Sequence, residues 1–257
     1  MENNLFSLEG KVAIVTGGNG GIGEGIVKGF GAAGANVAVV ARNQQKIKKT
    51  VEEMERRFKR RVMGVSCDVS SEEEIQAMMA EVHKTFGKIH ILVNNAGMNI
   101  RKMPQDYASA EWDQVLDTNL RGPFLCCRAV YPYMKAAGMG KILNIGSMTS
   151  IFGGPKLAAY GSSKGGIIQL TKSLATAWAP DNIQVNAILP GWIDTELTRQ
   201  ARKDIEGLNE KVLERTPAGR WGVPADLAGA AVFLASAASS FVTGTAIPID
   251  GGFSAAM

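Results

Sequence analysis

The chain has 257 residues, of which 46% are hydrophobic and 20% are charged, and its formal net charge is +4. This length and apolar share predict one large α/β domain over residues 1–257, with enough apolar side chains for a full core. No apolar stretch is long enough to predict a membrane span, and the start of the chain, MENNLFSLEGK, lacks a signal-peptide pattern, so we expect a soluble, cytoplasmic protein.

Seven short β-branched runs alternate with segments in which apolar residues recur three and four positions apart. The runs are KVAIVT, NVAVVA, RVMGVS, KIHILVN, KILNIGS, NIQVNAIL and TAIPID. This alternation is typical of a parallel sheet that is covered by helices on both faces. With a glycine-rich turn after the first run, it predicts an α/β fold: a single doubly wound Rossmann-type domain with a seven-stranded parallel sheet.

The first run ends in the glycine-rich turn VTGGNGGIG, and a helical pattern follows it. Such glycines permit a tight turn and a close approach of the backbone to a pyrophosphate at the start of the next helix. The position between a strand and a helix therefore favours a dinucleotide site over a simple turn. The residues expected to contact the cofactor here are Gly17, Asn19, Gly20, Gly21, Ile22 and Gly23.

The residues after the second run, Arg42 and Asn43, indicate which dinucleotide binds. An NAD site usually offers a carboxylate to the ribose hydroxyls at this point, but the first acid here is Glu52. Arg42 can instead form a charge-assisted contact with a 2′-phosphate. We therefore expect NADP, with NAD as the alternative if Arg42 only faces solvent.

A basic run extends from Arg42 to Arg61, with nine basic residues and three acidic ones. Ile47, Val51, Met54 and Phe58 recur within it at helical spacing. This pattern predicts the solvated face of an amphipathic helix. We expect no nucleic-acid binding, because base-reading motifs and interleaved aromatic residues are both missing.

A second motif follows the run KILNIGS, which ends at Ser147. Tyr160 and Lys164 lie four residues apart, so a helix places both side chains on one face, where an ammonium favours the phenolate over the phenol. Tyr131 and Lys135 share this spacing, but a proline lies between them and no serine-ended strand precedes them. We therefore assign the chemistry to Tyr160 and a structural role to Tyr131.

In the order of its motifs the chain resembles the short-chain dehydrogenase/reductase family over essentially its whole length. The motifs are TGGNGGIG, Asp68-Val69, NNAG at 94–97, Asn119, Ser147, YxxxK and PGWIDT at 190–195. The resemblance implies an NAD(P)-dependent enzyme that interconverts a secondary alcohol and a ketone, and a homotetramer.

The resemblance also implies roles for individual residues. Tyr160 exchanges a proton with the substrate oxygen, Ser147 polarises that oxygen, Lys164 binds the nicotinamide ribose, and Asn119 holds a water in the proton relay. Because tyrosine titrates at about 10, we expect Lys164 and the oxidised nicotinamide to lower the pKa of Tyr160. Asp68 accepts from the adenine amine, unless it caps the following helix instead. The remaining cofactor contacts are Val69, Asn95, Ala96, Gly97, Tyr160, Lys164, Pro190, Gly191, Ile193 and Thr195.

The substrate is the least constrained part of the prediction. The long insertion at about residues 191–216, bracketed by proline and glycine, predicts a substrate lid. Arg101 and Lys156 are expected to flank the pocket, where cations can meet a carboxylate. The expected substrate contacts are Arg101, Ser147, Met148, Tyr160 and Trp192. Three features are most similar to family members that act on sugar acids, the gluconate and deoxygluconate dehydrogenases. They are the opening FSLEGKVAIVTGG, the pair Asn99 and Arg101, and the tail ERTPAGRWGVPADLAGAAVFLAS with GTAIPIDGGF.

Other functions remain open at this point. A 3-oxoacyl-carrier-protein reductase has an acidic partner that could use the basic surface, and a reductase of small cyclic ketones is another alternative. A Rossmann protein that senses a cofactor without turnover is a third class. The complete Ser, Tyr, Lys and Asn set argues against that class.

Metal sites and disulfides are not expected. His83 and His90 are the only histidines, without a ligand spacing around them, and we expect both at the surface or at helix ends. Cys67, Cys126 and Cys127 are odd in number and two are adjacent, which indicates buried free thiols in a reducing compartment.

Overall fold

A seven-stranded, all-parallel sheet forms the centre of the computed structural model, which describes residues 4–256. The strands lie in the order β3-β2-β1-β4-β5-β6-β7. Their bounds are β1 Val12–Thr16, β2 Asn36–Ala41, β3 Val62–Ser66, β4 Ile91–Asn94, β5 Gly140–Ile145, β6 Ile183–Pro190 and β7 Ala246–Ile249. Each of the seven expected runs overlaps one strand, and no strand extends more than one residue beyond its run, so the predicted doubly wound fold is confirmed.

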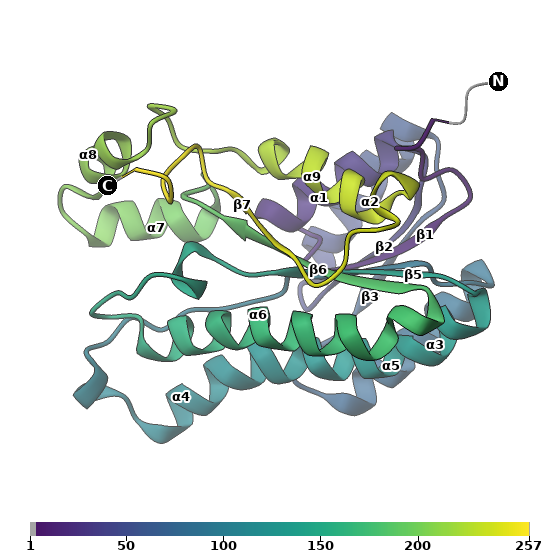
Figure 1. Cartoon of the computed structure of the whole chain (residues 1–257), viewed down its shortest axis with the longest axis horizontal. Coiled ribbons are helices and arrows are strands. Elements are labelled where there is room, and N and C mark those ends of the chain that lie inside the picture. The colour runs from purple at the N-terminus through teal and green to yellow at the C-terminus, as the bar shows by residue number, and fades with distance from the viewer. Residues whose placement is uncertain (1–3, 257) are drawn as a thin grey trace.

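Helices cover both faces of this sheet (Figure 1). In the figure α3, α4, α5 and α6 lie below the sheet, α1, α2 and α9 lie above it, and α7 and α8 lie beyond its left end. The bounds are α1 Gly21–Ala32, α2 Gln44–Phe58, α3 Glu72–Phe86, α4 Ser109–Leu116, α5 Gly122–Ala137, α6 Ala158–Trp178, α7 Glu196–Asp204, α8 Leu208–Arg215 and α9 Ala228–Ala235. A π-helical turn at Asp117–Arg121 joins α4 to α5.

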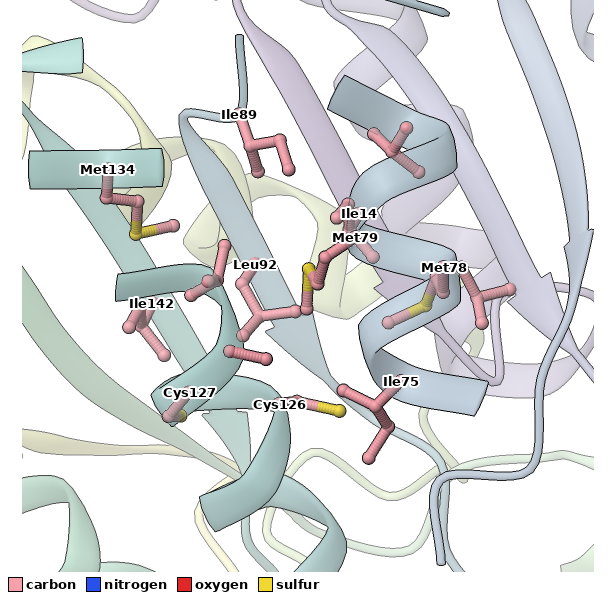
Figure 2. Close-up of a cluster of buried hydrophobic side chains, with 14 of the residues drawn as sticks. Ile14, Ile75, Met78, Met79, Ile89, Leu92, Cys126, Cys127, Met134 and Ile142 are labelled. Atoms are coloured by element: carbon pink, nitrogen blue, oxygen red, sulfur yellow. The ribbon is translucent and has the colours of Figure 1, made fainter. Parts of the chain in front are cut away.

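Two hydrophobic cores separate the sheet from its helical layers. In the first, Met79 of α3 and Met134 of α5 pack with Leu92 of β4 (Figure 2). In the second, Phe30 of α1 and Leu234 of α9 pack on the opposite face of the sheet. Because both faces are covered, every residue of the central strands β1, β4, β5 and β6 is buried, including the polar residues among them.

The strand order fixes where a ligand can bind. The chain leaves β1 toward β2 and later returns to add β4 on the other side of β1, so the order reverses between β1 and β4. In open α/β sheets a crevice forms at such a reversal, beyond the carboxyl ends of the strands. All strands are parallel, so the glycine-rich turn, the NNAG segment and Ser147 meet at that edge.

Both histidines are expected at the surface or at helix ends, and this is confirmed for His83 but wrong for His90. His83 lies in the last turn of α3, where its ring is 4.9 Å from that of Tyr133. His90 is only 7% exposed, and its Nδ1 accepts a hydrogen bond from the backbone N of Val12 at 3.1 Å. The expected surface position of His90 is therefore wrong, because the residue directly precedes a central strand. Burial, with smaller contributions from the Lys11 and Lys88 charges, lowers the pKa of His90 to about 4.

The basic run forms α2 as expected, with Ile47 and Met54 buried. Cys67, Cys126 and Cys127 are free and buried. Among residues 4–256 no helix combines the length and apolar character needed to cross a bilayer. Within the same residues, no three His, Cys, Asp or Glu side chains gather as metal ligands would. Residues 1–3 of MENNLFSLEGK lie outside the described part of the chain.

Candidate active site

The glycine-rich turn after β1 leaves no room for side chains where it packs on the NNAG segment. A Cβ on Gly17 would lie 2.8 Å from Asn95 Nδ2, and a Cβ on Gly23 would lie 2.1 Å from the oxygen of Gly17. Gly17 and Gly21 also have φ angles of +63° and +52°, which favour glycine. A Cβ on Gly20 would meet nothing within 4 Å, so the start of α1 is open. An open helix start of this kind suits a pyrophosphate.

Thr16 and Asn95 hold this turn and the NNAG segment together. Thr16 Oγ1 accepts hydrogen bonds from the backbone N of Asn95 at 3.0 Å and of Ala96 at 3.1 Å. The Asn95 amide donates in return to the backbone oxygens of Thr16 at 3.0 Å and Gly17 at 3.1 Å. The ends of β1 and β4 are therefore fixed relative to one another by side chains as well as by the sheet.

A cleft starts at this turn and passes the carboxyl ends of β4, β5 and β6, and a second hollow continues it to the ends of β2 and β3. The residues expected to contact a dinucleotide line these two spaces, with one exception. Those that line them are Gly17, Asn19, Gly20, Gly21, Ile22, Arg42, Asn43, Asp68, Val69, Asn95, Ala96, Gly97, Tyr160, Lys164, Pro190, Gly191, Ile193 and Thr195. Gly23 is the exception, because it is buried behind the turn.

Arg42 and Asp68 face one another at the far end of the cleft. Their side chains lie 3.5 Å apart, and the Arg42 side chain is 76% exposed. Burial would raise the pKa of Asp68, but hydrogen bonds from Ser70 and the Arg42 charge outweigh it and hold the pKa low. The cap of α3 is Ser71, whose Oγ accepts from Glu74 N, so Asp68 is not the helix cap.

Ser147, Tyr160 and Lys164 come together where the cleft meets a second pocket. Ser147 follows β5, and both Tyr160 and Lys164 lie on α6, facing it. Lys164 Nζ donates to the Ile145 oxygen at 2.7 Å and lies 5.7 Å from the centre of the Tyr160 ring. Helical spacing thus places the two side chains side by side, as the sequence predicts.

The acidity of Tyr160 differs from the expectation. Burial raises the pKa of Tyr160, and the hydrogen bond with Ser147 and the charge of Arg101 offset this only in part. Burial also lowers the pKa of Lys164 to about 8, because that side chain is only 5% exposed. Lys164 is not among the groups that lower the pKa of Tyr160, so its part of the predicted lowering is not found. The part assigned to the oxidised nicotinamide stays a prediction.

Asn119 lies in the π-helical turn and is 1% exposed. Its Oδ1 accepts from Met98 N at 2.8 Å, and its Nδ2 donates to Met98 O at 2.8 Å and to Ser163 Oγ at 3.1 Å. The side chain thereby fastens the segment after NNAG to α6. The water that the family resemblance implies at Asn119 stays a prediction.

The second pair with YxxxK spacing, Tyr131 and Lys135, lies away from the site. Tyr131 donates to Asp181 Oδ2 at 2.6 Å and accepts from Lys135 Nζ at 3.2 Å. Its ring packs 4.9 Å from that of Trp178. This pair joins α5 to the end of α6, and neither residue lines the cleft.

The pocket beyond Tyr160 has a volume of about 450 Å³ and differs from the expectation in its cations. Arg101, Met148 and Trp192 line it as predicted. Lys156 does not; it is exposed outside the pocket wall. Arg215, which sequence reasoning missed, lines the pocket instead, with its guanidinium 5.4 Å from the Phe152 ring centre and 4.3 Å from that of Phe253.

No local pattern marks Arg215, because three distant segments bring it to the pocket. Phe152 follows Ser147, Arg215 ends α8, and Phe253 lies near the end of the chain. Among residues 4–256, neither Arg215 nor Arg101 has an ion-pair partner. The pocket therefore presents two guanidinium groups that are free to meet an anion.

The segment expected to be a lid forms α7 and α8. Leu197, Thr198 and Gln200 of α7 line both the cleft and the pocket, and Arg215 of α8 lines the pocket. Thr195 Oγ1 caps α7, and Asp194 binds Arg199 at 2.9 Å and also Arg202. The Arg202 guanidinium lies 4.0 Å from the centre of the Trp221 ring, which packs edge-on against Trp192. These contacts hold α7 close to the pocket wall.

The whole chain is similar to known proteins. Residues 17–254 match the model of a protein family described as enoyl-(acyl carrier protein) reductase. The 2-dehydro-3-deoxy-D-gluconate 5-dehydrogenase of Escherichia coli (strain K12) is 41% identical over 97% of this chain and 98% of its own. Among solved structures, the gluconate 5-dehydrogenase of Burkholderia cenocepacia J2315 in complex with NADP and tartrate is 37% identical, with a TM-score of 0.93 and 99% of each chain covered.

A further solved structure, described as a short-chain alcohol dehydrogenase from Sinorhizobium meliloti 1021, is 39% identical with a TM-score of 0.95, and the match covers 98% of this chain and 100% of that one. These similarities extend over the cleft, the pocket and the helices around them, since they cover nearly all of each chain. The chain belongs to the short-chain dehydrogenase/reductase family.

Proposed function

We propose that this NAD(P)-dependent oxidoreductase interconverts a secondary hydroxyl and a ketone on a sugar acid, with NADP(H) as its cofactor. The observation that carries the proposal is that Ser147 and Tyr160 line both the cofactor cleft and the pocket that holds Arg101 and Arg215. A substrate in that pocket therefore reaches the proton donor and the cofactor together. The gluconate and deoxygluconate dehydrogenases among the relatives support the same substrate class.

The residues of the site divide the chemistry among them. When bound, the nicotinamide supplies or accepts the hydride. Tyr160 Oη gives a proton to the carbonyl oxygen in reduction and takes one from the hydroxyl in oxidation, while Ser147 Oγ polarises that oxygen. Lys164 binds the ribose, and Asn119 positions the Met98 segment and holds the relay water. Because burial raises the pKa of Tyr160, the phenol is present at neutral pH as the acid that reduction needs.

The pocket offers suitable partners for a polyhydroxy acid. Arg101 and Arg215 are unpaired cations for a carboxylate. Asn99 Oδ1 and Thr149 Oγ1, which belong to residues of the pocket wall, are buried polar atoms without a hydrogen-bond partner in the described residues. Unsatisfied buried oxygens favour a ligand that brings hydroxyl donors.

The NADP preference rests on Arg42 and on the lack of an acid beside it until Glu52. Asp68 is the nearest carboxylate in space, but it is held by Ser70 and accepts from Arg42. The NADP complexes of the relatives support this choice. We propose that Arg42 binds the 2′-phosphate and that Asp68 accepts from the adenine amine.

A 3-oxoacyl-carrier-protein reductase is the second candidate. The matching family is described as a reductase of another acyl-carrier-protein substrate, an enoyl group, so it supports this candidate only in the carrier. Phe152, Trp192 and Phe253 supply apolar wall that also suits an acyl chain or a small cyclic ketone. The two unpaired guanidinium groups and the unsatisfied oxygens make the sugar acid the better candidate.

We further propose that residues 1–257 form one domain with 191–216 as its substrate lid, and that four chains assemble in the cytoplasm. Phe124 on α5 and Phe241 before β7 are exposed apolar side chains suited to subunit contacts. The free buried cysteines suit a reducing compartment. Light scattering at micromolar concentration should give the mass of a tetramer; a stable monomer would contradict the assembly.

A substrate panel tests the proposed reaction. Purified protein is incubated with NADP⁺ or NAD⁺ and gluconate, and with NADPH or NADH and a keto-sugar acid, a neutral ketose, a 3-oxoacyl thioester or a cyclic ketone, while nicotinamide absorbance is followed. We expect turnover of the sugar acids with NADP(H) and much less with the neutral ketose. Preference for the thioester would establish the second candidate instead.

A further inference from the structure

Lys46 lies at the mouth of the cofactor cleft, in the first turn of α2. It borders the cleft beside the glycine-rich turn and also the hollow that contains Arg42, Asn43 and Asp68. Its backbone N donates to Asn43 Oδ1 at 2.9 Å, which caps α2 and fixes this turn against the end of β2. Arg42 and Lys46 are thus two cations in the wall of one hollow, beside the start of a helix.

Lys46 already binds an anion, and that anion comes from the lid. Its Nζ donates to Glu196 Oε2 at 2.7 Å, and Glu196 is the first residue of α7. Glu196 lines the same two spaces as Lys46. The ion pair therefore joins α2 to α7 in the wall of the cleft. The contact with the Glu196 carboxylate shows that the Lys46 ammonium can bind an anionic oxygen at this point of the cleft.

This ion pair is easily exchanged. The Lys46 and Glu196 side chains are 53% and 87% exposed, and exposed ion pairs contribute little because water screens both charges. A phosphate group carries more negative charge than a carboxylate and offers three acceptor oxygens. An anion of that kind, placed beside Arg42, would displace Glu196 from Lys46.

We infer that Lys46 is a second cation for the 2′-phosphate of NADP(H), and that Glu196 of the lid competes with this phosphate for Lys46. The inference rests on the proposed NADP-dependent function and adds a specificity-determining pair to it. NADH has a hydroxyl where NADPH has the phosphate, so it leaves the Lys46–Glu196 pair in place. Lys46 thus favours NADPH, and Glu196 opposes it.

The two partners predict changes of opposite sign, which binding measurements can detect. Affinities for NADPH and NADH are measured by quenching of tryptophan fluorescence, and those for 2′,5′-ADP and 5′-AMP by calorimetry. Lys46→Met should weaken NADPH and 2′,5′-ADP about five- to thirtyfold, as loss of one charge-assisted contact would. Glu196→Gln should tighten both about two- to fivefold, the range of an exposed ion pair. NADH and 5′-AMP should change less than about twofold.

Two further proteins complete the experiment. The double variant Lys46→Met, Glu196→Gln should bind NADPH like the single Lys46→Met variant, because Glu196 acts only through Lys46. Lys48→Met is the matched control: Lys48 lies on the same helix, pairs with Glu52 at 3.9 Å, is 80% exposed and lines neither space. It should leave all four affinities unchanged.

The inference fails if Lys46→Met weakens NADPH and NADH equally, or if Glu196→Gln weakens NADPH. In both cases, if the wild-type protein binds NADPH, only the inference is refuted, and the substrate panel still decides the proposed function. Wild-type protein that binds neither dinucleotide would refute the proposed function itself, and the inference with it.

Discussion

The proposed cofactor cleft and the proposed substrate pocket share Ser147 and Tyr160 but are built in different ways. In the cleft, backbone packing fixes residue type: a Cβ on Gly17 or Gly23 would lie within 2.8 Å of a neighbouring atom. In the pocket, side chains from separate segments form the wall, such as Arg215 against Phe253. The first wall tolerates few sequences and so has a motif, whereas the second can change its charges without changing the fold.

The largest expected effect concerns Tyr160, one of the residues that line both the cleft and the pocket. Tyr160→Phe removes the proton donor but keeps the ring, so kcat should fall about 10²- to 10⁴-fold while NADPH affinity is kept. Tyr131→Phe is the control, because Tyr131 has the same YxxxK spacing but bonds to Asp181 on the surface. Steady-state kinetics that show equal losses for both variants would disprove the assignment of Tyr160.

The pocket wall should discriminate by charge. Arg101→Ala and Arg215→Ala should each lower kcat/KM for an acidic sugar about ten- to a hundredfold if the residue binds its carboxylate, with a much smaller effect on the neutral ketose. Kinetics with the two substrates identify which guanidinium meets the carboxylate. If kcat/KM falls equally for the acidic sugar and the neutral ketose, the replaced arginine does not bind the carboxylate.

A pH profile separates the two arginines further. The Arg101 charge lowers the pKa of Tyr160, so Arg101→Ala should raise that pKa. Oxidation needs the phenolate, and its rate rises with pH through this pKa. The profile of kcat for oxidation should therefore move to higher pH in Arg101→Ala and stay in place in Arg215→Ala. A shift in neither variant would mean that Arg101 does not act on Tyr160.

Substitution of a glycine in the glycine-rich turn should change the stability of the protein through packing. Gly23→Ala would put a Cβ 2.1 Å from the Gly17 oxygen and should lower the free energy of unfolding by about 1 to 3 kcal/mol. Gly165→Ala is the matched control in α6, because a Cβ there meets nothing within 4 Å. That change should be neutral or stabilise by up to about 1 kcal/mol. Urea unfolding of both variants checks the difference, and similar midpoints would contradict it.

The smallest effect is expected at His90, which lies at the amino end of β4, whereas the cleft and the pocket lie at the carboxyl ends of the strands. The folded pKa of His90 is about 4, below its ordinary value of 6.5, so the unfolded chain binds more protons between these values. Stability is fully present above pH 6.5 and is lost as pH falls toward 4. We expect a loss of about 1 to 2 kcal/mol between pH 7 and 5 in urea unfolding. His90→Asn should flatten this acid limb; an unchanged limb would assign the loss to other groups.

The sequence alone determined the fold and the meeting of Ser147, Tyr160 and Lys164 in one cleft. Alternating apolar runs dictate a covered parallel sheet, and parallel strands bring their carboxyl ends to one edge. Motifs that follow successive strands must then meet there. Helical spacing alone places Tyr160 beside Lys164, so these features follow from local rules repeated along the chain.

Only the tertiary structure decided the electrostatics of the site and the wall of the pocket. The pKa of Tyr160 depends on burial, which a helical pattern does not show. His90 is buried because the strand that it precedes lies in the middle of the sheet. Arg215 and not Lys156 lines the pocket because α8 and the end of the chain fold against the segment after Ser147. Such contacts join residues far apart in sequence, and their distances follow from packing, which a motif does not encode.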